Sequence, residues 1–119
     1  MNFRNLNVWQ LSIELVEQIY TLTAKFPYEE KFGLTSQIRR SSISIPSNIA
    51  EGSSRKSRKE FAHFLSIAIG SSFELETQLL IASKIKLIDV NFYTEVSQKL
   101  NQIQATLSSY QKKIIQSVD

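Results

Sequence analysis

The sequence predicts an all-α fold, an antiparallel up-down-up-down four-helix bundle made by a single domain over residues 1–119. Apolar residues recur at spacings of three and four in four segments, which is the period of an amphipathic helix. Only three glycines and two prolines interrupt the 119 residues, too few for the many turns of an all-β fold. The stretches between the segments are short, so successive helices should be neighbours.

The first predicted helix covers residues 6–26 and has an unusually wide apolar face. Two adjoining stripes form this face, one with Trp9, Ile13, Val16 and Tyr20, the other with Val8, Leu11, Leu15, Ile19, Leu22 and Phe26. Pro27 should end the helix, because the residue before a proline avoids the α region.

The second predicted helix covers residues 34–51. Its apolar face holds Leu34, Ile38, Ile45 and Ile49. Gly52 is placed to cap the C-terminus. Pro46 lies inside the helix, where it should bend the axis and leave the Ser42 carbonyl without its usual partner. Nearby serine hydroxyls could satisfy such backbone groups. The alternative is a helix that breaks at Ile45.

The third predicted helix starts at Ser57 and continues to about Lys86. Ser57 and Glu60 have the spacing of a capping box, in which each side chain caps a free N–H group. The apolar positions are Phe61, Phe64, Leu65, Ala68, Leu75, Leu79 and Ala82. A second line of small residues, Ala62, Ser66 and Gly70, should let another helix approach closely.

The fourth predicted helix has the most regular pattern and begins after Asp89, which can cap it. Its apolar residues repeat at spacings of three and four, as in a bundle seam. They are Phe92, Val96, Leu100, Ile103, Leu107, Tyr110, Ile114 and Val118.

Composition restricts the chemistry and the setting of the protein. No cysteine is present, which excludes disulfides, zinc–thiolate sites and thiol catalysis and fits a reducing cytoplasm. A cytoplasmic location is therefore expected. The N-terminus lacks a signal-peptide pattern, and no run of apolar residues looks long enough to span a bilayer, so we expect no membrane partner.

Signals for catalysis are weak. His63 is the only histidine, and its neighbours four residues away are Lys59 and Ile67, so it forms no helical metal pair. The three glycines stand apart and make no phosphate-binding loop. We therefore expect no catalytic residue, cofactor or metal site, and a protein that is not an enzyme.

One edge of the second helix is polar. It carries Arg40, Ser44, Asn48 and Glu51 at helical spacing. These side chains could form a buried polar network as readily as a binding groove. The structural alternative for Glu74 of the third helix is a salt bridge or hydrogen bond to an arginine of a neighbouring helix, with Arg39 or Arg40 as the natural partner.

Positive charge is concentrated in one part of the chain. Residues 39–59 hold six basic residues and one acidic residue, a local charge of +5, while the whole chain carries +3, which leaves −2 elsewhere. Such a sector fits a polyanion, although it could equally be a solvated face. The candidate phosphate-contact residues are Arg39, Arg40, Arg55, Lys56, Arg58, Lys59, Lys84, Lys86, Lys112 and Lys113. Aromatic residues are not interleaved with these cations, which favours phosphate contact over base stacking.

Three stretches resemble a known bacterial family. They are FRNLNVWQ, KFPYEEKFGLTSQIRRSSISIPSNIAEG and SRKEFAHFLSIAIGSSFELETQL, and the most specific part is the pattern from Gln37 to Gly52. The chain is similar there to a four-helix-bundle family whose members include proteins encoded by intervening sequences in 23S ribosomal RNA genes. Avd, the accessory variability determinant of diversity-generating retroelements, is related to that family.

The resemblance implies an antiparallel four-helix bundle that assembles as a homopentamer through the wide apolar face of the first helix. It also implies nucleic-acid binding by a basic surface without catalysis. The function expected is thus a non-enzymatic oligomeric bundle that binds RNA or DNA through phosphate contacts. The alternative is a protein-interaction scaffold, such as an accessory subunit of a retroelement reverse transcriptase.

Overall fold

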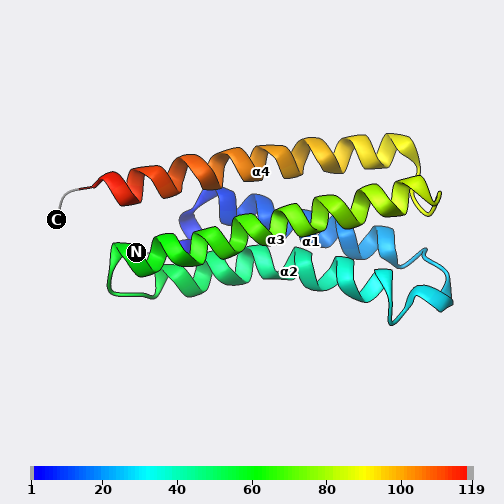
Figure 1. The fold of residues 1–119 in the computed structure, drawn as a ribbon, viewed down its shortest axis with the longest axis horizontal. Helices are drawn as coiled ribbons and strands as arrows, with labels where there is room; N and C mark the ends of the chain where they lie inside the picture. The colour runs from blue at the N-terminus through cyan, green and yellow to red at the C-terminus, as the bar shows by residue number, and fades with distance from the viewer. Residues whose placement is uncertain (1, 118–119) are drawn as a thin grey trace.

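Four antiparallel helices, described by a computed structural model over residues 2–117, pack side by side into an elongated bundle (Figure 1). The helices are α1 (Asn7–Thr23), α2 (Leu34–Ser53), α3 (Arg58–Lys84) and α4 (Val90–Gln116), with short 3₁₀ helices η1 (Phe3–Asn5) and η2 (Tyr28–Glu30). The bundle measures 50 × 24 × 20 Å. The predicted all-α four-helix bundle is confirmed, and no strand occurs in the described part of the chain.

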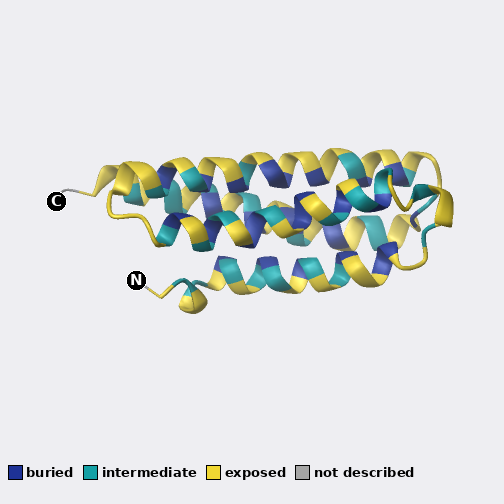
Figure 2. Ribbon diagram, turned by 90° about the horizontal axis from the view of Figure 1, so that it is seen from below, coloured by how far each residue is buried: buried dark blue, intermediate teal, exposed yellow. Residues whose placement is uncertain are grey.

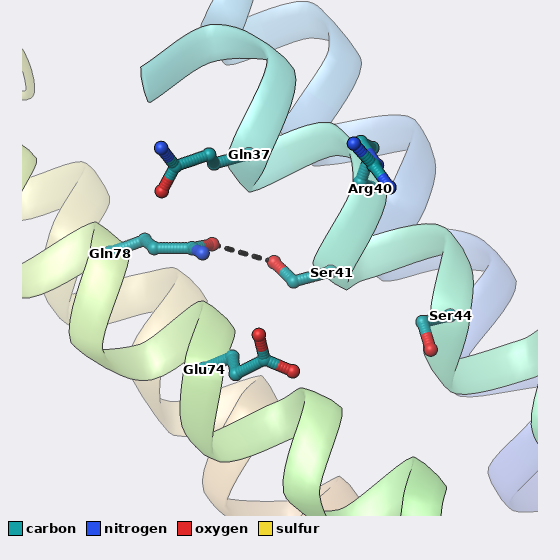
Figure 3. A pocket seen from close by; sticks show the side chains of 6 residues that line it. All are labelled: Gln37, Arg40, Ser41, Ser44, Glu74 and Gln78. Carbon is teal, nitrogen blue, oxygen red and sulfur yellow. Dashed lines mark hydrogen bonds between the residues drawn. The ribbon is translucent and has the colours of Figure 1, made fainter. Parts of the chain in front are cut away.

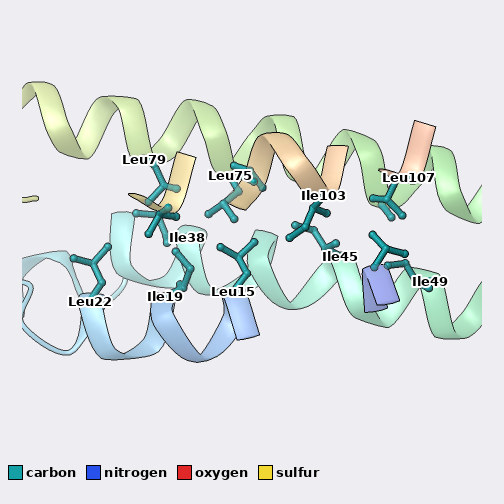
Figure 4. Close-up of a cluster of buried hydrophobic side chains, with 14 of the residues drawn as sticks. Leu15, Ile19, Leu22, Ile38, Ile45, Ile49, Leu75, Leu79, Ile103 and Leu107 are labelled. Carbon is teal, nitrogen blue, oxygen red and sulfur yellow. The ribbon is translucent and has the colours of Figure 1, made fainter. Parts of the chain in front are cut away.

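The core lies along the inner faces of all four helices (Figure 2). α2 and α3 pack most extensively against each other, and α1 contacts α4 to close the bundle. The fully buried side chains include Leu15, Ile19, Ile38, Ile45, Ile49, Leu65, Leu75, Leu79, Val96, Leu100, Ile103 and Leu107 (Figure 4). Burying one Leu or Ile side chain contributes about 1.5–3 kcal/mol, so this set dominates the stabilisation. The predicted apolar seams therefore do form the core, except for the α1 stripe of Trp9, Ile13, Val16 and Tyr20, which is only partly buried.

The end of α1 differs from the sequence prediction. The helix stops at Thr23, four residues before Pro27, which instead precedes η2. Lys25 and Phe26 continue the chain in a tighter turn, with their N–H groups donating to the carbonyls of Leu22 and Thr23. The prediction that Pro27 directly ends the helix is therefore wrong.

α2 continues through Pro46 to Ser53, which rules out a break at Ile45. The Ser42 hydroxyl donates to the Arg39 carbonyl one turn earlier, at 2.8 Å. Within residues 2–117 no serine hydroxyl donates to the Ser42 carbonyl, so the serines do not replace the bond that Pro46 removes.

Gly52 does not cap α2, and that prediction is wrong. It lies inside the helix and is buried. A Cβ atom at this position would lie 2.7 Å from Cβ of Phe64 and 2.9 Å from Cδ1 of Phe61. Glycine is thus required here because α3 approaches the α2 backbone closely.

The N-caps predicted at Ser57 and Asp89 are present, but within residues 2–117 the Glu60 carboxylate does not accept from the Ser57 N–H, so the capping box is only half formed. Ser57 Oγ accepts a hydrogen bond from the Glu60 N–H at 3.0 Å, and Asp89 Oδ1 accepts one from the Asn91 N–H at 3.1 Å. α3 ends at Lys84, two residues earlier than predicted, and Lys86 turns the chain with a positive φ of 66°. In the predicted α4 seam, Val118 lies outside the described residues.

The line of small residues on α3 has two different environments. Ala62 and Ser66 receive the Gln111 side chain of α4, whose Nε2 donates to the Ala62 carbonyl at 2.8 Å and to Ser66 Oγ at 2.6 Å. Gly70 is exposed, and a Cβ atom there would have nothing within 4 Å. Within one chain, the close approach of another helix therefore does not explain why position 70 is a glycine.

Among the described residues, α3 is the one helix whose length and apolar composition would allow it to cross a membrane. A third of its most apolar 18-residue stretch is buried inside the bundle. The expectation that no segment has this character is thus wrong. In this fold the apolar residues of α3 divide between the core and an exposed face.

Candidate nucleic-acid interface

The fold separates the ten predicted phosphate-contact residues into three groups. Six of them lie where α2 ends, α3 begins and α4 ends, which is one end of the bundle (Figure 1). We call this group the basic end; it consists of Arg55, Lys56, Arg58, Lys59, Lys112 and Lys113. Lys84 and Lys86 lie at the opposite end, and Arg39 and Arg40 lie in the first half of α2. The ten residues therefore do not form one continuous surface.

The basic end is built on the turn between α2 and α3. Arg55 is held there by an ion pair with Glu51, with 2.9 Å between Nη2 and Oε2, and its guanidinium lies 4.7 Å from the Phe64 ring centroid. Lys56 is exposed, and Ser57 then caps α3. The turn thus presents cations on a backbone fixed at both sides.

The C-terminal end of α4 completes this surface. Lys112 and Lys113 are exposed in its last turns. Between α3 and α4 lies a shallow cleft of about 380 Å³, lined by Arg58, Lys59, Ala62, Ile114, Ile115 and Ser117. Residues more than fifty positions apart in the sequence are thereby brought onto one surface.

The cations of α3 in the basic end are unfavourable for the helix itself. Arg58 and Lys59 are its first two residues, where the helix macrodipole is positive and disfavours a cation by about 0.3–1 kcal/mol. The same dipole and the free N–H groups favour an anion, so a bound phosphate would be stabilised by both the helix and the side chains.

The Arg39 side chain is held by contacts inside the bundle. Its Nε donates to Thr23 Oγ1 at 2.8 Å, and its guanidinium lies 4.5 Å from the Tyr20 ring centroid. Both partners belong to α1, so Arg39 joins α2 to α1. The prediction that Arg39 could pair with Glu74 is wrong.

Arg40 and Glu74 face the same cleft between α2 and α3 (Figure 3). Within residues 2–117, no hydrogen bond or ion pair joins them, so the predicted pairing is also wrong for Arg40.

The polar edge of α2 is not one buried network. Asn48 Nδ2 donates to the carbonyl and to Oγ of Ser44, at 2.8 and 2.9 Å, and Ser44 Oγ lies 2.7 Å from Ser71 Oγ. Glu51 binds Arg55 instead, and Arg40 is exposed on the cleft. This edge could have formed a buried polar network or a binding groove. At its Arg40 end, a groove describes it better.

Two apolar surfaces are left uncovered by the bundle. The α1–α2 groove, of about 360 Å³, is lined by Phe3, Trp9, Ile13, Val16, Ile43, Pro46, Ser47 and Ala50. The α3 stripe consists of Ile67, Phe73, Leu80, Ile81 and Ile85, all exposed. The wide apolar face of α1 predicts the first surface. The second was not predicted, because its residues lie outside the core-facing pattern of the third helix.

Few groups outside these surfaces suggest chemistry. His63 is exposed, with its ring centroid 5.7 Å from that of Phe64. Burial raises the pKa of the Tyr110 phenol, so this group is neutral at pH 7. In residues 2–117, no cluster of three His, Cys, Asp or Glu residues could hold a metal ion.

Comparisons with known proteins give a family and a structural relative. The family model for the 23S rRNA-intervening sequence protein matches residues 4–109. A crystal structure of a protein of unknown function from the S23 ribosomal protein family of Bacteroides thetaiotaomicron is 28% identical, covers 88% of this chain and 98% of its own, and has a TM-score of 0.83. A search of curated proteins finds no match.

Proposed function

The chain belongs to the 23S rRNA-intervening sequence protein family, and from this premise we propose that it is a non-enzymatic, oligomeric bundle that binds RNA or DNA through phosphates. The observation that carries the proposal is the basic end. Residues 51–60 and 112–113 place six cations there against the carboxylates of Glu51 and Glu60. This surplus lies on the ends of three helices, where a phosphate backbone can reach it.

The macrodipole of α3 does not favour the cations at its start. A sequence selected only for a stable helix would favour acidic residues in the first turn. Arg58 and Lys59 open that turn, and the acidic Glu60 follows them. Their position is favourable once an anion is bound, because the anion interacts with the side chains and with the helix end together.

The mode of binding follows from the residue types. Lys and Arg side chains on an exposed surface contact phosphates without reading bases, so binding by the basic end should depend weakly on sequence and strongly on salt. Each phosphate contact contributes about 0.9 to the slope of log K against log salt concentration for duplex DNA.

Self-association would extend this surface. The α1–α2 groove is lined by the half-buried Trp9, Ile13 and Val16 and by the exposed Ile43, and apolar surfaces of this kind mark interaction sites. The family resemblance implies a homopentamer, in which the charge of +3 per chain becomes +15 for five copies. Light scattering should give the mass of five chains, and the mass of one chain would exclude this part of the proposal.

The direct test measures binding to a structured RNA and to duplex DNA from about 50 to about 200 mM salt. We expect affinity to fall steeply over this range. Changing Arg55, Lys56, Arg58 and Lys59 together to Ala should weaken binding and, for duplex DNA, reduce the salt slope by up to about 3.6. Lys84→Ala with Lys86→Ala, at the opposite end, is the matched control and should leave binding nearly unchanged.

Two results would contradict nucleic-acid binding by the basic end. One is affinity that stays constant across the salt series. The other is a quadruple Ala variant that binds like the parent while remaining folded by circular dichroism. If only the Lys84 and Lys86 variant lost binding, the phosphate contacts would lie at the other end of the bundle.

A second candidate function is a protein-interaction scaffold, such as an accessory subunit of a reverse transcriptase. The α3 stripe favours it, because this surface is apolar and separate from the α1–α2 groove. In this case the isolated protein would not bind nucleic acid but would bind purified reverse transcriptase, and Phe73→Asp with Ile81→Asp would abolish that complex.

A further inference from the structure

A polar cleft lies between α2 and α3 (Figure 3). Its volume is about 380 Å³, within the usual range for ligand sites. Six polar side chains line it: Gln37, Arg40, Ser41 and Ser44 from α2, and Glu74 and Gln78 from α3. The α2 wall of the cleft belongs to the Gln37–Gly52 pattern on which the family resemblance rests. Phosphate binding by the basic end gives these α2 residues no role.

Part of this cleft is fixed by internal hydrogen bonds. The Ser41 hydroxyl donates to Gln78 Oε1 at 2.7 Å. Ser44 Oγ is 2.7 Å from Ser71 Oγ and also accepts from Asn48. The bond from Ser41 fixes the Gln78 amide and leaves its Nε2 group to donate.

Three of the lining side chains retain their hydrogen-bonding capacity. Gln37, Arg40 and Glu74 make no side-chain hydrogen bond or ion pair within residues 2–117. The Glu74 carboxylate extends from α3 towards α2 (Figure 3). The cleft therefore offers an anionic acceptor on one wall and cationic and amide donors nearby, a combination suited to a ligand with adjacent donors and an acceptor.

Among nucleobases, guanine matches this combination. Its Watson–Crick edge carries two neighbouring donors, N1–H and the N2 amine, which one carboxylate can accept together, and the O6 acceptor lies beside them. Adenine offers a single amine on that edge, uracil and thymine a single ring N–H, and cytosine an amine beside two acceptors. The Glu74 carboxylate can thus distinguish guanine from the other bases by a bidentate pair.

We propose that this cleft binds an unpaired guanine of the bound nucleic acid, with Glu74 accepting from N1–H and the N2 amine while Gln78 Nε2 or Arg40 donates to O6. The proposal rests on the proposed function and adds a base preference to it. The guanine must be unpaired because its Watson–Crick edge is occupied by protein, as in the recognition of RNA loops and single strands.

The cleft and the basic end can act on one strand. Arg40 and Arg55 lie on or just after the same helix, fifteen residues apart, which corresponds to about 22 Å along its axis. A strand of about ten nucleotides can span this length, so phosphates at the basic end would hold the strand while the cleft selects one base.

The test uses fluorescence anisotropy with single-stranded oligoadenylates of about twelve nucleotides. The first strand carries a central guanine, the second a central inosine, which lacks the N2 amine, and the third contains only adenine. Each strand is made as RNA and as DNA, to show which of the two nucleic acids the protein binds. The guanine strand should bind about tenfold more tightly than the adenine strand, with inosine between them, because a good bidentate contact discriminates by this order.

Glu74→Gln should abolish the guanine preference and leave binding to oligoadenylate unchanged, since the amide places an NH2 donor, in place of the second carboxylate oxygen, against one of the two guanine donors. Glu76→Gln is the matched control: Glu76 lies two residues away, accepts from Gln104 at 2.8 Å and is outside the cleft. It should retain the preference. Thermal unfolding of both variants checks that they fold.

Each remaining outcome overturns the inference. Equal, salt-dependent binding of all three strands would exclude a guanine site while phosphate binding by the basic end stands. A guanine preference that survives Glu74→Gln would place the site elsewhere. Absence of binding to every strand at low salt would remove the proposed function and the guanine site together.

Discussion

The two ends of the bundle carry similar numbers of charges but arrange them differently. At the basic end, residues 51–60 and 112–113 contain six cations and two carboxylates. At the opposite end, residues 25–31 and 84–89 contain four cations and three carboxylates. Lys84 lies in the last turn of α3, where the macrodipole favours a cation. The macrodipole therefore favours Lys84 at the opposite end and disfavours the two cations at the start of α3.

The backbone at the two ends differs as well. The basic end depends on the close approach of α2 and α3 at Gly52. The opposite end turns through Lys86 in a left-handed conformation that costs a residue with a side chain about 1 kcal/mol. The first end is thus fixed by packing, and the second contains an unfavourable turn residue.

The largest effect should follow from Gly52→Ala. The new Cβ would lie 2.7 Å from Cβ of Phe64, so α2 and α3 must separate, at a cost of about 1–3 kcal/mol. Thermal unfolding followed by circular dichroism should show a midpoint lower by about 10 °C. Gly70→Ala is the control, because its site is open; it should raise stability by about 0.5–1 kcal/mol. Equal destabilisation by both changes would contradict the packing role of Gly52.

An intermediate effect is expected at the opposite end. Lys86→Gly should stabilise the protein by up to about 1 kcal/mol, because glycine adopts a φ of 66° without the cost that Lys carries. Urea unfolding at constant m-value should show a higher midpoint. Lys84→Gly, which places glycine in the last turn of the helix, should instead lower the midpoint. A lower midpoint for Lys86→Gly would mean that the turn is not strained.

The smallest change in stability is expected for charge reversals at the two ends of α3. These variants should distinguish most clearly a role in nucleic-acid binding from a role in stability. Lys59→Glu puts an acidic residue in the first turn of α3 and should stabilise the fold by about 0.5 kcal/mol at low salt. Lys84→Glu puts one in the last turn and should destabilise it by a similar amount. Nucleic-acid affinity should fall for Lys59→Glu and change little for Lys84→Glu. If Lys59→Glu lowered both stability and affinity, Lys59 would have a structural role.

Much of the fold could be predicted from local pattern. The spacing of Val96, Leu100, Ile103 and Leu107 placed the buried face of α4 correctly, and Ser57 and Asp89 marked the starts of α3 and α4. These features are visible in the sequence because helical period and capping act over a few residues. The end of α1 was misplaced, because a proline limits how far a helix can extend without fixing where it ends.

The candidate sites were less predictable. Arg39, Arg40 and Glu74 were expected to interact, yet Arg39 binds Thr23 of α1 and the other two face a cleft. As single residues in the sequence, Gln37 and Gln78 give no functional signal. Their importance depends on the register of α3 against α2, which the sequence pattern of either helix alone leaves open.

The sequence by itself determined that four helices form, which face of each is apolar, and that residues 39–59 are strongly basic. These properties follow from residue order and from the 3.6-residue helical period. Only the tertiary structure decided which glycine meets another helix, which cations share one end of the bundle, and which polar side chains stay uncommitted in the cleft. The reason is that antiparallel packing brings residues such as Arg58 and Ile114 together, and such contacts depend on how whole helices pack.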